Sequence, residues 1–236
     1  MKKSRILIIP ARSGSKRIRN KNIKLFNGKP IITYPIKEAA KSNLFNKIHV
    51  STDSNKIANV SIKSGASVDF LRPKKLSGDN ASLFRVIKYV KKKYELLGSN
   101  FDEIWCILPS SPLLTSNDLK KFAKFYNKKN NPMIIASPYP SPLNWSFEIK
   151  NNLLKNVNKK MRDLKLSKKK FYYDSGQVYC FNNSYLKKKD FSFKDKISVL
   201  TLPLEKSVDI DHIEDWKFAE VLYQGLKKIK KWNFNF

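Results

Sequence analysis

The residues best suited to chemistry form a basic loop near the N-terminus. Residues 6–9 are apolar and mostly β-branched, which predicts a buried strand that ends at Pro10. The loop that follows is rich in small residues and carries the cations Arg12, Lys16, Arg17, Arg19 and Lys21. Small side chains leave backbone N–H groups uncovered, and such groups beside cations are typical of a site for phosphate or another polyanion. A solvated basic turn is the alternative.

A second candidate is the acidic pair in residues 208–211, Val-Asp-Ile-Asp. In an extended segment Asp209 and Asp211 point the same way with Cα atoms about 6.5–7 Å apart, so both carboxylates can reach one cation. Oxygen ligands beside phosphates suit Mg²⁺. The alternative is that Asp211 and Glu214 form a helix capping box, which would leave Asp209 unexplained. Spacing alone leaves metal binding and capping open.

A third candidate is the polar run Tyr-Tyr-Asp-Ser-Gly-Gln at residues 172–177, just before an apolar run. It offers donors and acceptors for a hydroxylated ligand, or it is a turn capped by Asp174. The chain has no GxxxxGK[ST] phosphate loop and no GxGxxG dinucleotide turn, because Gly14 stands alone. A triphosphate carries about four negative charges, so fixed cations favour nucleotide activation over oxidoreduction.

The elements that must position these residues alternate between strand and helix signals, which predicts an α/β fold with a mainly parallel sheet. After the first strand, at residues 5–10, further strands are expected at residues 48–52, 68–71, 104–108, 133–137, 178–181 and 199–204. Helices are expected at residues 30–40, 54–62, 82–96, 116–126 and 211–231. Pro35 should delay or kink the first helix. The loops after the first, third and fourth strands should meet at the carboxyl edge of the sheet.

The caps of these helices can also be assigned. Asp53 or Ser54 should cap the second helix, and Ser116 the fourth. The pattern weakens between residues 138 and 170, which we interpret as an insertion within a single domain of 236 residues.

The composition bounds the class of protein. Lys and Arg number 48 against 19 Asp and Glu, which gives a net charge of +29 and permits binding to nucleic acid or an anionic membrane surface. The lysines recur in short runs along the whole chain, so we interpret most of them as solvated surface. Cys106 and Cys180 lie in apolar runs and are expected to be buried thiols, and no Cys/His cluster suits zinc. No apolar run approaches the ~20 residues that span a bilayer, and we expect a cytoplasmic protein.

Several motifs together resemble one family. They are IPARSGSKRIRNKNIK (residues 9–24), GKP (28–30), VSTD (50–53), FLRP (70–73), LSGD (76–79), PSSPL (109–113) and DID (209–211). In this order they resemble the CMP-nonulosonate cytidylyltransferases, the acylneuraminate cytidylyltransferase family, across nearly the whole chain. Residues 16–18 and 173–177 are most similar to the family's pseudaminic acid branch.

The resemblance implies a fold, a reaction and partners. The fold would be a Rossmann-like three-layer nucleotidyltransferase fold, with residues 138–170 as a small dimerisation insertion in a homodimer. The reaction would be CTP + pseudaminate → CMP-pseudaminate + diphosphate with Mg²⁺ as cofactor. The same transfer to N-acetylneuraminate, legionaminate or another 2-keto sugar acid is the near alternative. A non-catalytic protein that binds nucleic acid or an anionic surface is the alternative from another class.

The resemblance also assigns site residues. Arg12 and Lys21 would hold the triphosphate, with Asn22 at the α-phosphate and ribose and Ala11 beside them. Arg72, Ala81 and Ser82 would recognise cytosine. Asp209 and Asp211 would hold Mg²⁺. Tyr173, Asp174 and Gln177 would bind the sugar. Arg12, Lys21, Asp209 and Asp211 would be the catalytic residues. The chain departs from the family pattern at Ser13, Arg19 and Tyr173, where Gly, Pro and His or Arg are usual.

Overall fold

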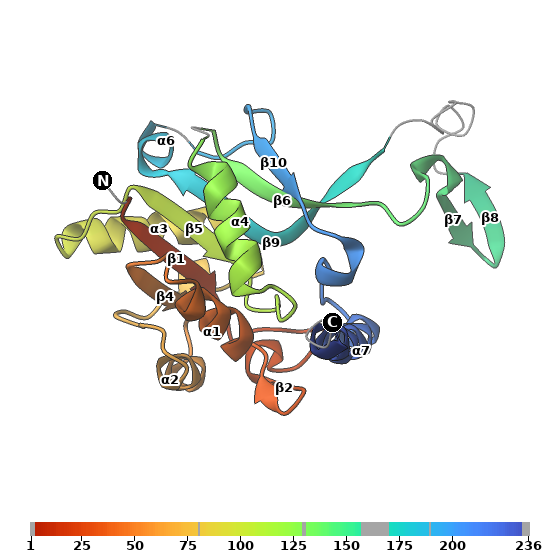
Figure 1. Cartoon of the computed structure of the whole chain (residues 1–236), viewed down its shortest axis with the longest axis horizontal. Coiled ribbons are helices and arrows are strands. Elements are labelled where there is room, and N and C mark those ends of the chain that lie inside the picture. Colours follow the sequence, from red (N-terminus) through yellow and green to blue (C-terminus); the bar gives the residue numbers. More distant parts are fainter. Residues whose placement is uncertain (1–2, 80, 129–130, 157–169, 189, 233–236) are drawn as a thin grey trace.

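A computed structural model describes residues 3–79, 81–128, 131–156, 170–188 and 190–232 (Figure 1). Its central sheet has six strands in the order β10-β6-β9-β5-β1-β4. These strands are β1 (Arg5–Pro10), β4 (Lys47–Ser51), β5 (Glu103–Ile107), β6 (Met133–Pro138), β9 (Tyr172–Asn182) and β10 (Ser198–Thr201). β1 is parallel to β4 and β5, and β6 is parallel to β10, whereas β9 lies antiparallel between β5 and β6. The predicted mainly parallel sheet is therefore confirmed, with β9 as the exception.

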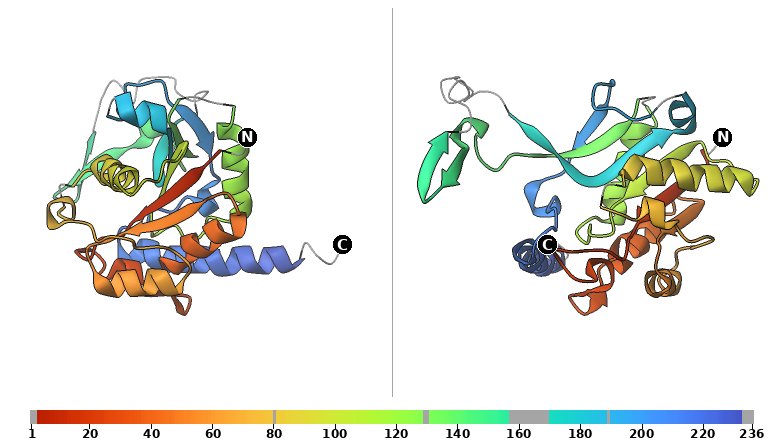
Figure 2. Two further views of the ribbon diagram at one scale, coloured as in Figure 1. Left: turned by 90° about the vertical axis from the view of Figure 1, so that its left-hand side faces the viewer. Right: turned by 180° about the vertical axis from the view of Figure 1, so that it is seen from behind.

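Helices cover both faces of this sheet and make three layers (Figures 1 and 2). They are α1 (Thr33–Ser42), α2 (Asn55–Lys63), α3 (Leu83–Leu96), α4 (Ser116–Tyr126), α6 (Asn183–Lys188) and α7 (Ile213–Trp232). Leu7 and Ile9 of β1 pack in one core with α1, α2 and α4, while Ile6 and Ile8 pack in a second core with α3 and α6. An uninterrupted apolar strand suits a sheet that is buried on both faces.

A third, smaller core ties α7 to the basic loop after β1. Ile18 of that loop shares this core with Ile210, just before α7, and with Trp216 of α7. The short strands β2 (Leu25–Phe26) and β3 (Lys29–Pro30) pair beside it, and Phe26 is one of its buried residues. The core therefore fixes the basic loop against the segment that carries the acidic pair.

The helix starts differ in detail from those predicted. Pro30 pairs in β3, so α1 begins only at Thr33 and Pro35 falls in its first turn, where a missing N–H costs no helical hydrogen bond. Ser54 rather than Asp53 caps α2. The cap of α4 is Thr115 and not Ser116, because Thr115 and Asp118 form a reciprocal capping box.

The strand predicted at residues 68–71 is wrong. This segment follows the outer edge of β4, but its pairing is limited to an isolated bridge between His49 and Ser67. Further along, the Arg72 amide donates to the Thr52 carbonyl at 2.7 Å. Between these points Phe70 turns inward and stacks on the His49 ring, with the ring centroids 4.6 Å apart. The inward turn replaces the regular ladder that a strand needs.

Part of the predicted insertion lies among the described residues, and the insertion itself stays a prediction. β7 (Phe147–Lys150) and β8 (Leu153–Asn156) form a hairpin whose turn residues Asn151 and Asn152 have positive φ, as a type I′ turn requires. The hairpin stands away from the sheet beyond β6 and β9 (Figures 1 and 2). Residues 157–169 of the predicted insertion lie outside the described residues.

The two cysteines are free and fully buried, in β5 and β9, as predicted. Burial raises the pKa of both thiols, which keeps them protonated. Among the described residues, no helix has the length and apolar character needed to cross a membrane.

A buried ion pair at the start of β1 is expected to dominate local stability. Arg5 Nε lies 2.7 Å from Glu103 Oε2, with side chains 6% and 0% exposed. Glu103→Gln would leave the arginine charge without its partner, at a cost of about 3 kcal/mol in the free energy of unfolding measured by urea denaturation. Lys3 also binds Glu103 but is 37% exposed, so Lys3→Met is the matched control and should cost under about 1 kcal/mol. Equal stability of Glu103→Gln and wild type would contradict this prediction.

A buried histidine is expected to make stability depend on pH. Burial lowers the pKa of His49 from 6.5 to about 4; Asp69 opposes this shift and Lys47 adds to it. Between these values only the unfolded chain binds the proton, so stability should fall as pH decreases from 6.5 toward 4, by about 3 kcal/mol in all. In His49→Phe the dependence of unfolding free energy on pH should be flatter over this window. Parallel pH profiles for the variant and wild type would refute the assignment.

Candidate functional site

The basic loop after β1 and the segment before α7 meet in a cleft at the carboxyl end of the sheet. A cavity of about 220 Å³ lies there. Its lining residues are Pro10, Arg12, Ser15, Lys16, Arg17, Ile18, Lys21, Asn22, Leu108, Pro109, Ser110 and Asp211. The loops that follow β1 and β5 therefore converge as predicted, and the acidic segment joins them.

One aspartate from a different loop neutralises part of the basic loop. Arg12 Nη1 lies 2.6 Å from Asp79 Oδ1, and Lys16 Nζ lies 2.7 Å from Asp79 Oδ2. These cations lower the pKa of Asp79, Lys16 more than Arg12. Sequence reasoning gave Asp79 no role, because its partners are far away along the chain.

The acidic pair meets the other cations of the loop. Arg17 Nη1 lies 2.7 Å from Asp211 Oδ2, and Lys21 Nζ lies 3.5 Å from Asp211 Oδ1. The Lys21 ammonium also donates to the Ile210 carbonyl at 2.6 Å. Arg19 is exposed and has no ion pair within the described ranges. Four cations of the loop are thus paired with two aspartates, Arg12 and Lys16 with Asp79 and Arg17 and Lys21 with Asp211.

Capping does not account for Asp211. Asp215 accepts the backbone N–H groups of Asp211 and His212 at 3.0 and 2.7 Å, and α7 begins at Ile213. The alternative of a capping box between Asp211 and Glu214 therefore does not hold, because Asp215 accepts these N–H groups. The Asp211 carboxylate is left to face the cleft.

Asp209 lies nearby without a cation partner of its own among the described residues. Its side chain keeps an open face to solvent, but the surrounding protein removes part of its hydration and so raises its pKa. The negative charge of Asp211 raises that pKa further. The two carboxylates are therefore close enough to repel each other.

The main chain of the loop is held by polar side chains. Asp53 accepts the Ser13 backbone N–H and the Ser13 hydroxyl at 2.9 and 2.8 Å. Asn22 is buried and donates from Nδ2 to the Arg12 carbonyl at 2.9 Å, beside buried Ala11. Serine at position 13, where the family pattern has glycine, therefore anchors the loop to the end of β4.

The polar run at residues 172–177 is part of β9 and not a turn before a strand. Gly176 has a φ of +67°, and a Cβ added there would lie 3.9 Å from Asp209 Oδ2. This places the run next to the acidic pair. Gln177 is buried and donates to the carbonyls of Lys206 and Val208 at 3.1 and 3.4 Å, so it holds the segment that carries Asp209.

Tyr179 is a polar residue of this region that sequence reasoning missed. Its hydroxyl donates to Asp174 Oδ2 at 2.8 Å, and Asp174 Oδ1 accepts the Gly176 N–H at 2.9 Å. Residues five apart lie on opposite faces of a regular strand, but a register shift opposite β6 and the positive φ of Gly176 bring these two together. A glycine inside a strand pattern was the available signal. Tyr173 instead packs its ring against Tyr139, with centroids 5.2 Å apart.

Arg72 is a buried cation with unused donors. It is 6% exposed, and its Nε and Nη2 have no hydrogen-bond partner among the described residues. Burial lowers its pKa, while Asp53 raises it and Arg12 lowers it, so the guanidinium lies near both. Ser82 precedes α3 and makes no capping hydrogen bond, and Ala81 is half-buried beside it. Arg72 is not among the residues that line the cleft cavity.

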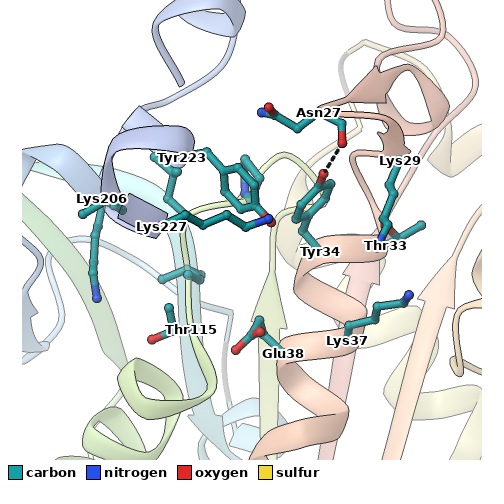
Figure 3. A pocket seen from close by; sticks show the side chains of 14 residues that line it. Asn27, Lys29, Thr33, Tyr34, Lys37, Glu38, Thr115, Lys206, Tyr223 and Lys227 are labelled. Atoms are coloured by element: carbon teal, nitrogen blue, oxygen red, sulfur yellow. Dashed lines mark hydrogen bonds between the residues drawn. The ribbon is translucent and has the colours of Figure 1, made fainter. Parts of the chain in front are cut away.

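A second cavity, of about 260 Å³, lies between α1, α7 and the loop before α4 (Figure 3). Tyr34 and Tyr223 form part of its wall, and the Lys227 ammonium lies 4.5 Å from the Tyr223 ring centroid. Lys206 also lines it, but its ammonium is held by Asp118 at 2.8 Å. None of the predicted site residues lines this cavity.

The fold is shared with a solved enzyme structure. CMP:2-keto-3-deoxy-manno-octonic acid synthetase complexed with CTP aligns with a TM-score of 0.72, and the alignment covers 94% of this chain and 99% of that one. The two sequences are 13% identical, so the likeness establishes the fold alone. The predicted three-layer fold is therefore confirmed.

Sequence comparison defines the family. Residues 6–229 match the family model described as cytidylyltransferase, and the chain belongs to this family of CTP-using enzymes. A pseudaminic acid cytidylyltransferase of Campylobacter jejuni subsp. jejuni serotype O:2 is 34% identical over 224 residues, which are 93% of this chain and 96% of the relative. A CMP-N,N′-diacetyllegionaminic acid synthase of Legionella pneumophila subsp. pneumophila is 29% identical over 222 residues, 93% of this chain and 96% of the relative. The resemblance read from the motifs is thereby confirmed.

Proposed function

We propose that this enzyme activates pseudaminic acid, CTP + pseudaminate → CMP-pseudaminate + diphosphate. The observation that carries the proposal is the 34% identity to a pseudaminic acid cytidylyltransferase over nearly the full length of both chains. The cleft supports it, because it combines a basic loop with the Asp211 carboxylate, and Asp209 lies close to Asp211; these are the groups that a nucleoside triphosphate and its metal require.

In this proposal the loop binds the phosphates. Arg12 and Lys21 hold the triphosphate, because both line the cavity and both carry a fixed positive charge. Asn22 keeps the Arg12 carbonyl in place and lies, with Ala11, beside the α-phosphate and ribose. Arg72 reads cytosine with Ala81 and Ser82, since its buried unpaired donors match the acceptor atoms of that base.

Asp209 and Asp211 fit a Mg²⁺ site. They offer carboxylate oxygens from one segment, and Mg²⁺ is usually held by one or two carboxylates together with substrate phosphates. The pKa of Asp209 is raised by partial loss of hydration and then by the charge of Asp211, and an added cation would reverse this shift. Bound there, Mg²⁺ would stabilise the negative charge that develops on the phosphates.

The chain's own residues then position the reactants. The anomeric hydroxyl of the sugar attacks the α-phosphate in line with the leaving diphosphate, while Arg12 and Lys21 stabilise the charge on the phosphate oxygens. That hydroxyl belongs to a 2-keto acid and is more acidic than an alkyl alcohol, so the proposal includes no dedicated histidine base. Tyr173, Asp174 and Gln177 are assigned to the sugar; they do not line the cleft cavity, and Gln177 acts through the segment that carries Asp209.

The hairpin of β7 and β8 is proposed to join two copies in a homodimer. Phe147 and Ile149 of the hairpin are apolar side chains at 50% and 72% exposure, and Trp145 just before it is 68% exposed. Such anchors gain stability when a partner covers them. We also propose that the protein acts in the cytoplasm on CTP and a nonulosonic acid, and that it binds neither nucleic acid nor membrane.

A panel of sugar acids tests the proposal. The enzyme is incubated with CTP, Mg²⁺ and, separately, pseudaminate, legionaminate, N-acetylneuraminate and 3-deoxy-octulosonate, and diphosphate release is measured. We expect the highest kcat/KM with pseudaminate. A higher value with another sugar acid would reassign the substrate within the family, and no turnover with any of them would overturn the proposed reaction.

A further inference from the structure

Asp79 lies outside the basic loop but pairs with two of that loop's cations. It lies between the proposed cytosine-reading residues Arg72 and Ala81, in a segment that precedes α3. Its two carboxylate oxygens are used one each, Oδ1 by Arg12 at 2.6 Å and Oδ2 by Lys16 at 2.7 Å. The carboxylate therefore occupies Arg12, which the proposed function gives to the triphosphate, together with the neighbouring cation Lys16.

The Asp79 carboxylate has no other partner among the described residues. Its side chain is 47% exposed, and of these residues it contacts only Arg12 and Lys16. Asp53 differs, because it accepts a backbone N–H and a hydroxyl from Ser13 and so builds the loop itself. Asp79 can therefore leave its partners without taking apart the loop's main chain.

The charge of Asp79 persists under working conditions. The ammonium of Lys16 and the guanidinium of Arg12 lower its pKa, so the carboxyl stays ionised near neutral pH. An incoming triphosphate must then compete with the Asp79 carboxylate for Arg12 and Lys16. Once the phosphates have left, the carboxylate can pair with these two cations again.

We propose that Asp79 is an exchangeable counter-anion of the phosphate-binding loop. It holds Arg12 and Lys16 between turnovers, yields them to the triphosphate of CTP, and takes them back as diphosphate leaves. It thereby lowers the occupancy of the phosphate-binding loop by weakly bound phosphates, and it speeds the release of diphosphate. The inference rests on the proposed function, because that function assigns Arg12 to the triphosphate.

The test compares Asp79→Asn with wild type by calorimetric titration of inorganic tripolyphosphate and of diphosphate at low salt. Removal of the competing charge should tighten both by about tenfold. In steady-state assays KM for CTP should fall, kcat should fall because diphosphate leaves more slowly, and product inhibition by diphosphate should increase. Asp190→Asn is the matched control: Asp190 is 81% exposed, pairs with Lys88 at 2.6 Å outside the cleft, and its loss changes the net charge equally. We expect that variant to bind as wild type does.

In the alternative, Asp79 serves only to hold the cytosine-reading segment in place, and a different result is expected. Asp79→Asn would then weaken CTP binding and leave tripolyphosphate, which has no base, unchanged. Unchanged or weaker tripolyphosphate binding by the variant overturns the inference. Failure of the proposed function has a separate sign, since wild type would then release no diphosphate from CTP with any sugar acid tested.

Discussion

Replacing Arg12 with alanine is expected to lower kcat/KM for CTP by about a hundredfold to a thousandfold. Arg12 lines the cleft cavity, and its guanidinium is one-third exposed toward the space where the phosphates would lie. A preorganised cation at that position stabilises the charge that builds on the phosphate oxygens in the transition state. The fold should persist, because an exposed ion pair such as that with Asp79 contributes little to stability.

Diphosphate release under subsaturating CTP measures this effect, with a thermal melt to verify folding. Arg19→Ala is the matched control, because Arg19 belongs to the same loop but lies outside the cavity lining and has no ion pair in the described part of the chain. Its kcat/KM should stay within about twofold of wild type. Equal losses in the two variants would mean that the loop acts through its overall charge and not through Arg12.

Asp211→Asn is expected to lower kcat by about a thousandfold, equivalent to roughly 4 kcal/mol of transition-state stabilisation. The change keeps the size of the side chain but removes a charge that faces Arg17 and Lys21, and with it one proposed Mg²⁺ ligand. The variant should also need a higher Mg²⁺ concentration for half-maximal activity. That second effect separates loss of a metal ligand from simple loss of an ion pair.

The measurement is a Mg²⁺ titration of activity in wild type, Asp211→Asn and Glu214→Gln. Glu214 is an exposed acid in the first turn of α7, and Asp215 does the capping, so Glu214→Gln should behave as wild type does. If Asp211→Asn had the same half-maximal Mg²⁺ concentration as wild type, the metal assignment would be wrong even if activity were low.

The regular elements could be predicted because their signals are local. Residues 6–9 and 104–107 are continuous apolar runs, and a strand buried on both faces needs such a run. The strand prediction at residues 68–71 failed because a contact with a distant residue overrode the local signal. Val68 and Phe70 carry strand-like side chains, but Phe70 packs on His49 instead of continuing an edge ladder.

The site could be predicted only in its parts. The cations of the basic loop and the acidic pair are visible as types and spacings, and the cleft brings Arg12, Lys21 and Asp211 together. Spacing could not separate capping from ligand binding at Asp211, because that choice depends on whether Asp215 takes the helix N–H groups. Periodicity in the sequence cannot predict a pairing such as Arg12 with Asp79, because the two residues lie in separate loops.

Phosphorus NMR of CTP, Mg²⁺ and pseudaminate incubated with the wild-type enzyme follows the proposed transfer itself. We expect the triphosphate resonances to decline while CMP-pseudaminate, seen by its phosphodiester resonance, and diphosphate form in equal molar amounts. Formation of CDP and inorganic phosphate, or unchanged CTP beside pseudaminate under conditions where another sugar acid is converted, would contradict it.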